Sequence, residues 1–213
     1  DTNLNRTVAL KVLPPRFCKF PEYLKRFRTE AQAQARLNSP HIVTLYELMA
    51  HPLGEILVLE YVEGERIDAY CTRWQLDVPA RLRLFIQVAH AVAHAHANLV
   101  VHRDLKPTNI LVTEAGEVRL LDFGIAKLLD EGRAQETELT QIAGRALTPD
   151  YAAPEQILGQ PIGTAADVYA LGVVLFEMLA GQRPYTLKRD SRAALEEAIL
   201  QADVARPSAV VDD

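Results

Sequence analysis

The segment VVHRDLKPTNILVTEAGEVRLLDFGIAK, residues 100–127, constrains the fold of this 213-residue chain more than any other. Its two apolar runs, NILV and VRLLD, are joined by TEAGE, whose glycine suits a tight turn, so the pattern predicts a β-hairpin. A turn centred on the Ala115–Gly116 peptide pairs Asn109 with Asp122, because both lie equally far from that point. Opposed residues of antiparallel strands lie roughly 5 Å apart. We therefore expect an amide oxygen and a carboxylate to converge at one end of the hairpin.

The residues just before the hairpin add charge to this end. Asp104 and Lys106 precede Asn109 in the run HRDLKPTN. Hard oxygen ligands close together, with a cation beside them, suit a magnesium ion and a phosphate group. The alternative is that Asp and Asn simply cap turns at strand ends, as either residue alone often does. The whole set at these spacings favours the metal and phosphate interpretation.

A lysine occupies an unusual place near the start of the chain. VALKVL, residues 8–13, alternates with period two, as a β-strand does, and puts Lys11 on one face with Ala9 and Leu13. Lysine is seldom found inside an apolar strand unless its charge is used or paired. Lys11 is therefore a candidate functional residue.

Strand patterns dominate the first part of the chain, and long helical patterns dominate the rest. Strands first and helices afterwards predict an α+β protein in two lobes, joined near Glu60–Gly64. The expected elements are a helix at 21–37, strands at 42–48 and 55–62, helices at 80–96, 167–181 and 191–202, and an irregular segment at 128–150.

Composition excludes several classes of protein. A net charge of −5 with 49% apolar residues is typical of a globular protein and gives no basic field for nucleic acid or an acidic membrane. The longest apolar stretch, 167–181, is too short for a membrane span and contains Asp167 and Glu177. Cys18 and Cys71 are widely separated, which indicates a reducing compartment. We expect a cytoplasmic segment without nucleic-acid or membrane contact, any membrane tether lying outside it.

Four histidines between residues 90 and 102 raise the alternative of a zinc site. His90 and His94 have i, i+4 spacing, but HAVAH lacks the glutamate of HExxH, and Cys71 has no partner. The ligand count and spacing disfavour zinc.

Several separate motifs, in the correct order, resemble the protein kinase catalytic domain. The resemblance covers nearly the whole chain and implies a small β-rich N-lobe with one helix and a mainly helical C-lobe. It places the N-lobe and hinge at residues 1–62 and the C-lobe at 63–213. The motifs are VALK (8–11), HRDLKPTN (102–109), DFG (122–124), AAPE (152–155) and DVYALGVVLFEMLAGQRPY (167–185).

The resemblance implies transfer of the γ-phosphate of ATP, with Mg²⁺, to serine or threonine hydroxyls of proteins. Lys11 would hold the α- and β-phosphates and pair with a carboxylate of the following helix. Glu30 is the expected partner, since it shares an inward stripe with Phe27 and Leu37. Other expected ATP-binding residues are Ala9 against adenine, Leu59 behind it, the backbone of Glu60 and Val62 at its edge, Leu111, and Asp122.

The catalytic roles follow from the same resemblance. Asp104 would accept the proton of the substrate hydroxyl or orient that hydroxyl, and Lys106 would steady the γ-phosphate. Asn109 and Asp122 would hold magnesium. Thr148 would link to Asp104 and shape the substrate lip, the segment at residues 148–151 just before AAPE. The presence of Thr148 together with Lys106 resembles the pattern of serine/threonine kinases. These residues supply the kinds of group that phosphoryl transfer requires, because the reaction needs positioning and charge neutralisation more than covalent chemistry.

Regulation by phosphorylation is also expected. Arg103, beside the catalytic aspartate, suits a phosphate, which could order a loop. The segment ETELTQIAGRALT offers Thr137 and Thr140 as acceptors, with Thr140 preferred, and the alternative is a solvated polar loop. Phosphorylation in trans would require transient self-association. The segment LTPDYAAPEQ, residues 147–156, resembles the corresponding segment of bacterial members of the family.

Two features depart from the family pattern. Gln34 stands where a large aliphatic residue would pack toward Phe123 and His102, which loosens that contact or requires a hydrogen-bond partner. Nothing before VALK resembles the glycine-rich loop, and RPSAVVDD closes the chain without the final helices. We therefore expect a domain cut at both ends and poorly active alone, because an uncovered triphosphate is badly positioned and open to water.

Two other functions fit parts of the pattern. A pseudokinase-like scaffold with weak or no transfer is favoured by Gln34 and the absent loop, and opposed by the intact catalytic set. A kinase-fold enzyme acting on small molecules such as aminoglycosides or choline shares the Asp-to-Asn spacing but lacks Lys106 and the APE pattern.

Overall fold

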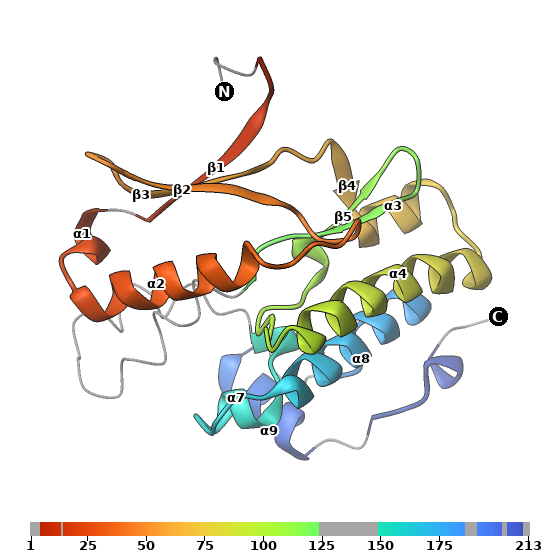
Figure 1. Cartoon of the computed structure of the whole chain (residues 1–213). Coiled ribbons are helices and arrows are strands. Elements are labelled where there is room, and N and C mark those ends of the chain that lie inside the picture. The colour runs from red at the N-terminus through yellow and green to blue at the C-terminus, as the bar shows by residue number, and fades with distance from the viewer. Residues whose placement is uncertain (1–4, 14, 124–148, 186–190, 202–203, 211–213) are drawn as a thin grey trace.

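The computed structural model describes residues 5–13, 15–123, 149–185, 191–201 and 204–210, without the side chains of residues 16, 26, 30, 149 and 192. These residues form two lobes, a sheet lined by one long helix and a mainly helical body (Figure 1). The expected α+β bilobal architecture is confirmed.

The first lobe is an antiparallel sheet in the order β1-β3-β2, with a helix on one face (Figure 1). Period-two alternation in β1 exposes Leu10 and Val12 on the outer face and buries Leu13 on the inner one, as predicted. Its elements are β1 (Val8–Leu13), α1 (Pro15–Cys18), α2 (Pro21–Gln34), β2 (Leu45–His51) and β3 (Gly54–Glu60). Its core consists of Leu13, Phe27, Ala31, Val43, Leu57 and Leu59.

Two predicted boundaries in this lobe are wrong. Helix α2 ends at Gln34, because Leu37 N–H donates to Gln34 O at 2.9 Å in a tightened last turn. The strand predicted from residue 42 begins only at Leu45. The residues before it pair across the lobes: Ile42 forms a parallel bridge with Leu120, and Val43 N–H donates to Leu120 O at 3.0 Å.

A second antiparallel sheet, in the order β4-β5-β6, lies where the lobes meet. Its strands are β4 (Gly64–Arg66), β5 (Ile110–Thr113) and β6 (Val118–Leu120). The β5–β6 hairpin exists as predicted, but its register differs by one residue. Ile110 pairs with Leu120, so Asn109 lies opposite Leu121, whose N–H donates to Asn109 O at 2.8 Å. The predicted Asn109–Asp122 pairing is therefore wrong, and Asp122 lies one residue beyond.

The turn explains the register. Gly116 N–H donates to Thr113 O at 2.9 Å and Thr113 N–H to Glu117 O at 3.0 Å, which closes a three-residue loop centred on Ala115. Gly116 has φ +76° and takes the left-handed position that such a loop requires.

The second lobe is built around α4 and α8, which pack against each other (Figure 1). Helix α4 also packs against β6 of the hairpin. The helices predicted at 80–96, 167–181 and 191–202 are confirmed with small shifts. Asp77 begins α4 by accepting Ala80 N–H at 2.9 Å, and Gly181, with φ +68°, ends α8. The helices are α3 (Ile67–Arg73), α4 (Val78–Ala97), α7 (Pro154–Ile157), α8 (Thr164–Ala180) and α9 (Arg192–Gln201), with single turns at Pro107–Asn109, Pro149–Tyr151 and Pro207–Ala209.

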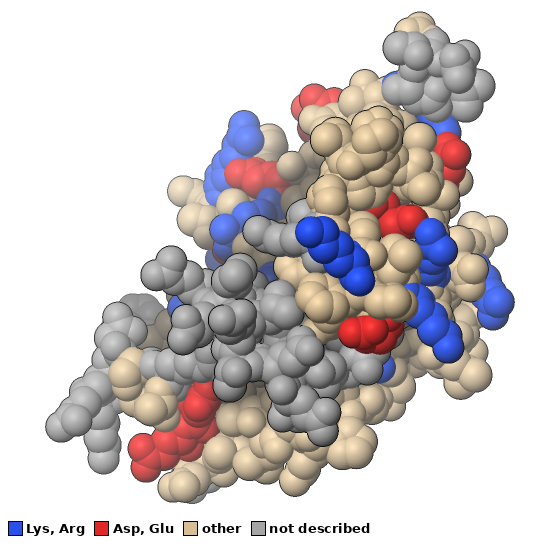
Figure 2. Space-filling model, turned by 90° about the vertical axis from the view of Figure 1, so that its left-hand side faces the viewer, with Lys and Arg blue, Asp and Glu red and all other residues tan. Residues whose placement is uncertain are grey.

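The described surface is mixed in charge. Figure 2 shows basic and acidic side chains interspersed on the face that it presents. No helix within the described ranges combines the length and apolar character needed to cross a bilayer.

Candidate active site

Lys11 and Asp122 meet between the lobes. Lys11 Nζ lies 2.8 Å from Asp122 Oδ1, and their side chains are 30% and 42% exposed. Sequence reasoning selected both residues but did not pair them with each other. Glu30 lies in α2 as expected, but its side chain is outside the described part of the structure, so the Lys11–Glu30 pair stays a prediction.

Asp104, Lys106 and Asn109 form a second charged cluster beside the first. Asn109 Nδ2 donates to Asp104 O at 2.8 Å and to Asp104 Oδ2 at 3.0 Å. Lys106 Nζ lies 2.8 Å from the same Asp104 Oδ2. Because Asp104 engages both amide hydrogens, the orientation of the amide is fixed and its oxygen faces away from that carboxylate.

The local backbone brings these side chains together. Residues Pro107–Asn109 form a single turn, in which Asn109 N–H donates to Lys106 O at 2.9 Å. Arg103 and Asp122 adopt left-handed conformations, with φ +66° and +48°. Non-glycine residues in this region are uncommon and concentrate at functional sites, where the surrounding structure holds them.

Asp167, in α8, holds the start of the catalytic loop, which is the segment HRDLKPTN at residues 102–109. This residue of α8 is 1% exposed, and its Oδ1 accepts Arg103 N–H at 2.7 Å. Its Oδ2 accepts His102 N–H at 2.7 Å and contacts His96 Nε2 at 2.8 Å. Sequence reasoning missed this role. The available signal was an acidic residue in the first turn of an otherwise apolar helix, since a buried carboxylate requires partners.

His102 joins the catalytic loop to the strand that carries Asp122. Its Nδ1 accepts Asp104 N–H at 3.3 Å and its Nε2 lies 2.8 Å from Leu121 O, so the proton resides on Nε2. Complete burial lowers the pKa of His102 despite the nearby carboxylate of Asp167, which keeps the ring neutral. The Phe123 ring packs on it with 4.8 Å between centroids. With His96 bound to Asp167, these contacts account for two of the four histidines considered as zinc ligands.

Gln34, the predicted departure from the family pattern, is 3% exposed at the end of α2. A buried amide at this position replaces an apolar contact with a polar group that requires hydrogen-bond partners.

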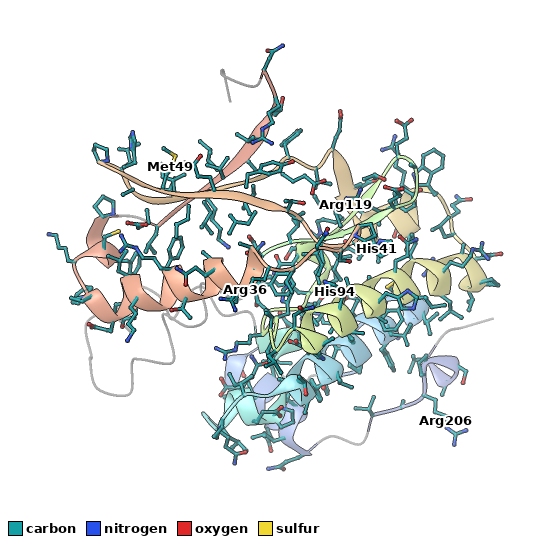
Figure 3. The ribbon with its side chains drawn as sticks, viewed as in Figure 1. Arg36, His41, Met49, His94, Arg119 and Arg206 are labelled. Atoms are coloured by element: carbon teal, nitrogen blue, oxygen red, sulfur yellow. The ribbon has the colours of Figure 1, made fainter. Side chains whose placement is uncertain are left out.

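Glu60, at the expected hinge, is held in place by contacts of its side chain and its backbone. Glu60 Oε2 accepts Thr44 N–H at 3.1 Å, and Glu60 N–H donates to Thr44 O at 2.9 Å. Arg119 Nε lies 3.5 Å from Glu60 Oε1, and its guanidinium also donates to Pro40 O. Figure 3 shows Arg119 close to His41 where the two lobes meet.

The residues expected around adenine come from both lobes. Leu59 is buried in the core of the first lobe, and Ala9 and Val62 pack against that core. Leu111 is half-buried on β5, opposite Arg119. Within the described ranges, nothing accepts a hydrogen bond from the Val62 N–H.

The substrate-lip residues are described only from Pro149 onward. Thr137, Thr140 and Thr148 lie outside the described residues. Tyr151 O–H donates to Glu177 Oε2 at 2.5 Å, and burial together with this carboxylate raises the pKa of the phenol. Asp150 forms an ion pair with Arg183. The described part of the lip is therefore tied to α8 and to the loop after it.

Comparison with known proteins identifies the family. The model of the protein kinase domain matches residues 1–210. The chain is 37% identical over 210 residues to the serine/threonine-protein kinase PrkC of Bacillus subtilis (strain 168), covering 98% of this chain and 31% of that protein. It is 41% identical over 191 residues to PknA of Mycobacterium tuberculosis (strain ATCC 25618 / H37Rv), covering 87% and 43%.

A third relative agrees with these two. The probable serine/threonine-protein kinase PknB of Bifidobacterium longum (strain NCC 2705) is 35% identical over 221 residues, covering 99% of this chain and 31% of that protein. The chain spans less than half the length of each of these relatives. On the family match and these identities, the chain belongs to the protein kinase domain family, of the type found in bacterial serine/threonine kinases.

Proposed function

We propose that this chain transfers the γ-phosphate of ATP to serine or threonine hydroxyls of proteins. The observation that carries the proposal is the convergence of two paired cations and carboxylates at one end of the β5–β6 hairpin, Lys11 with Asp122 and Lys106 with Asp104. Phosphoryl transfer requires this kind of positioned charge. We assign residues 1–62 to the N-lobe and hinge and residues 63–213 to the C-lobe.

The donor set fits magnesium. The amide oxygen of Asn109, turned away from Asp104, and the carboxylate of Asp122 are hard oxygen ligands. Magnesium would supply charge neutralisation at the phosphates. Since the Lys11–Asp122 pair is more than a third exposed at Asp122, it is weakly held, and phosphate oxygens can displace the carboxylate from Lys11.

Asp104 is the residue that receives the substrate hydroxyl. Asn109 and Lys106 hold its Oδ2, and its backbone N–H is bound by His102, so the carboxylate is oriented before substrate arrives. Lys106 would move from Asp104 toward the γ-phosphate as charge develops there. Thr148 would complete the lip by linking to both residues.

Adenine would lie between apolar side chains of both lobes. Ala9, Leu59, Val62 and Leu111 supply the apolar contacts, and the backbone of Glu60 and Val62 supplies the polar edge. The Thr44 and Arg119 contacts to Glu60 support this role, because they occupy its side chain and hold its backbone in place.

Control by phosphorylation is part of the proposal. Thr140, or alternatively Thr137, would accept a phosphate that pairs with Arg103, after transient self-association of two copies. We place this activity in a bacterial cytoplasm, with ATP, Mg²⁺ and protein substrates as partners.

A pseudokinase-like scaffold is the second candidate, and the buried Gln34 favours it. The names of the relatives favour a protein kinase over a small-molecule phosphotransferase. The deciding experiment incubates the natural protein with γ-labelled ATP and Mg²⁺, offering a mixed protein acceptor in parallel with aminoglycosides and choline. Label on serine and threonine supports the proposal. Nucleotide binding without transfer indicates a scaffold, and labelled small alcohols indicate a phosphotransferase.

A further inference from the structure

We propose that Gln156 is a positioning residue that fixes the peptide carrying Asp104 and couples it to the substrate-lip segment; this inference rests on the proposed kinase function. Gln156 lies in α7, 53 residues after Arg103. It ends the segment LTPDYAAPEQ, and the proposed mechanism gives its side chain no role.

The side-chain amide of Gln156 is engaged at both ends. Its Nε2 donates to Arg103 O at 3.0 Å, and its Oε1 accepts Ala153 N–H at 3.0 Å. A carbonyl only accepts and an N–H only donates, so the orientation of the amide is unambiguous. One side chain therefore bridges the start of α7 and the catalytic loop.

Arg103 is the residue whose conformation needs holding. Its φ of +66° is left-handed, which costs a non-glycine residue free energy unless its surroundings fix it. Asp167 binds its N–H from α8, and Gln156 binds its carbonyl from α7. Gln156 thus anchors the carbonyl side of this strained residue, as Asp167 anchors its N–H.

The carbonyl of Arg103 and the N–H of Asp104 belong to one planar peptide group. Gln156 therefore sets the direction of the Asp104 N–H, which points to His102 Nδ1 at 3.3 Å. Without the Gln156 donor, the carbonyl loses this hydrogen bond, and the peptide plane is held less firmly. Asp104 would then leave the position that a substrate hydroxyl requires.

The bridge also connects catalysis to the lip. The lip residues Asp150 and Tyr151, just before α7, are fixed by Arg183 and Glu177. A displacement of this segment moves Gln156 and so releases Arg103 O. The order of the lip is in this way transmitted to Asp104 through a single side chain.

A purely local role, capping α7 through Ala153, is the alternative. Gln156→Glu separates the two roles, because a carboxylate still accepts the Ala153 N–H but cannot donate to Arg103 O. A protonated glutamate can donate, so the defect of this variant should diminish as the pH falls. Gln156→Met removes both contacts and has no such pH response. Gln160→Glu, at an exposed position in the same segment, introduces the same charge as a control.

We expect Gln156→Glu to lower kcat at least about tenfold at neutral pH, within the ~10²-fold cost that a misplacement of about 1 Å can carry. The KM for ATP and the unfolding midpoint should stay within error of Gln160→Glu, and kcat should recover partly at lower pH. An unchanged kcat, or a loss matched by Gln160→Glu, would overturn the proposal.

Hydrogen exchange provides a readout that does not depend on activity. The amides of residues 102–104 should exchange faster in Gln156→Glu than in the wild-type protein. If the wild-type protein transfers no phosphate, the proposed function fails while faster exchange still supports the positioning role. Unchanged exchange at 102–104 contradicts that role whatever the activity.

Discussion

Lys11 Nζ and Asp122 Oδ1 lie 2.8 Å apart and connect the strand of one lobe to the end of the hairpin in the other. The two residues assigned to the phosphates and to the metal thus neutralise each other in the structure. Nucleotide and metal together can replace this pair without leaving either charge uncompensated, because the phosphates would bind Lys11 and the cation would bind Asp122.

Replacing Lys11 by Met should remove transfer without unfolding the protein. The phosphates lose their cation, and we expect kcat/KM for ATP to fall by about 10² or more. The free energy of unfolding should change by less than about 1 kcal/mol, because partly exposed ion pairs contribute little. Initial-rate kinetics and urea denaturation measure the two effects, with the exposed Lys25→Met as control. Unaltered kinetics would exclude Lys11 from the nucleotide site.

Asn109→Ala should change the magnesium requirement. The variant loses an oxygen ligand and both hydrogen bonds that orient Asp104. We expect the Mg²⁺ concentration for half-maximal transfer to rise several-fold and kcat to fall, while chelation with EDTA stops transfer in every variant. A magnesium titration checks this against the exposed Asn38→Ala. Identical titration curves for the two variants would refute the assignment of Asn109 as a ligand.

Asp167→Asn should destabilise the second lobe. The new amide keeps one acceptor oxygen, so its NH2 group faces one of the two backbone N–H groups that now donate to the carboxylate. Removing one partner from a buried charged network costs about 3–5 kcal/mol, so we expect a loss of that order in the free energy of unfolding. Denaturation by guanidinium chloride measures it, and the exposed Glu197→Gln should show almost none of this loss.

The neutral state of His102 predicts a loss of stability in mild acid. Burial lowers its pKa in the folded protein, so the unfolded chain binds the proton more readily. The stability contribution is present above the unfolded pKa of about 6.5 and is lost as the pH falls through the folded pKa. His102→Gln should flatten the dependence of unfolding free energy on pH between about 7 and 5. The exposed His51→Gln should keep the wild-type slope, and a steep slope retained in His102→Gln would rule out this origin.

The parts predicted correctly from sequence are those governed by local periodicity. The inward face of β1 follows from alternation, and α4 and α8 follow from their length and apolar pattern. The hairpin was identified, but its register depends on whether the loop has two or three residues, which Gly116 alone does not decide. The late start of β2 reflects pairing of residues 41–43 with β6, a contact between distant segments.

The candidate site shows the same division. Asp104, Lys106 and Asn109 lie within six residues, so a short turn brings them together and sequence reasoning found them. Asp167 and Gln156 act over 53 to 65 residues through backbone groups of residues 102 and 103. Nearly every residue has the same backbone N–H and carbonyl groups, so the sequence alone does not indicate which of them a distant side chain will bind.

The central claim is that Asp104 receives the substrate hydroxyl in a phosphotransferase, and Asp104→Asn tests it most directly. Transfer of labelled γ-phosphate to protein should fall by at least about 10²-fold, because the general base is lost. ATP affinity measured by calorimetry should stay within about twofold of wild type. Asp68→Asn, whose carboxylate pairs with Arg66 outside the site, serves as the matched control. Undiminished transfer by Asp104→Asn with normal ATP binding would contradict the account.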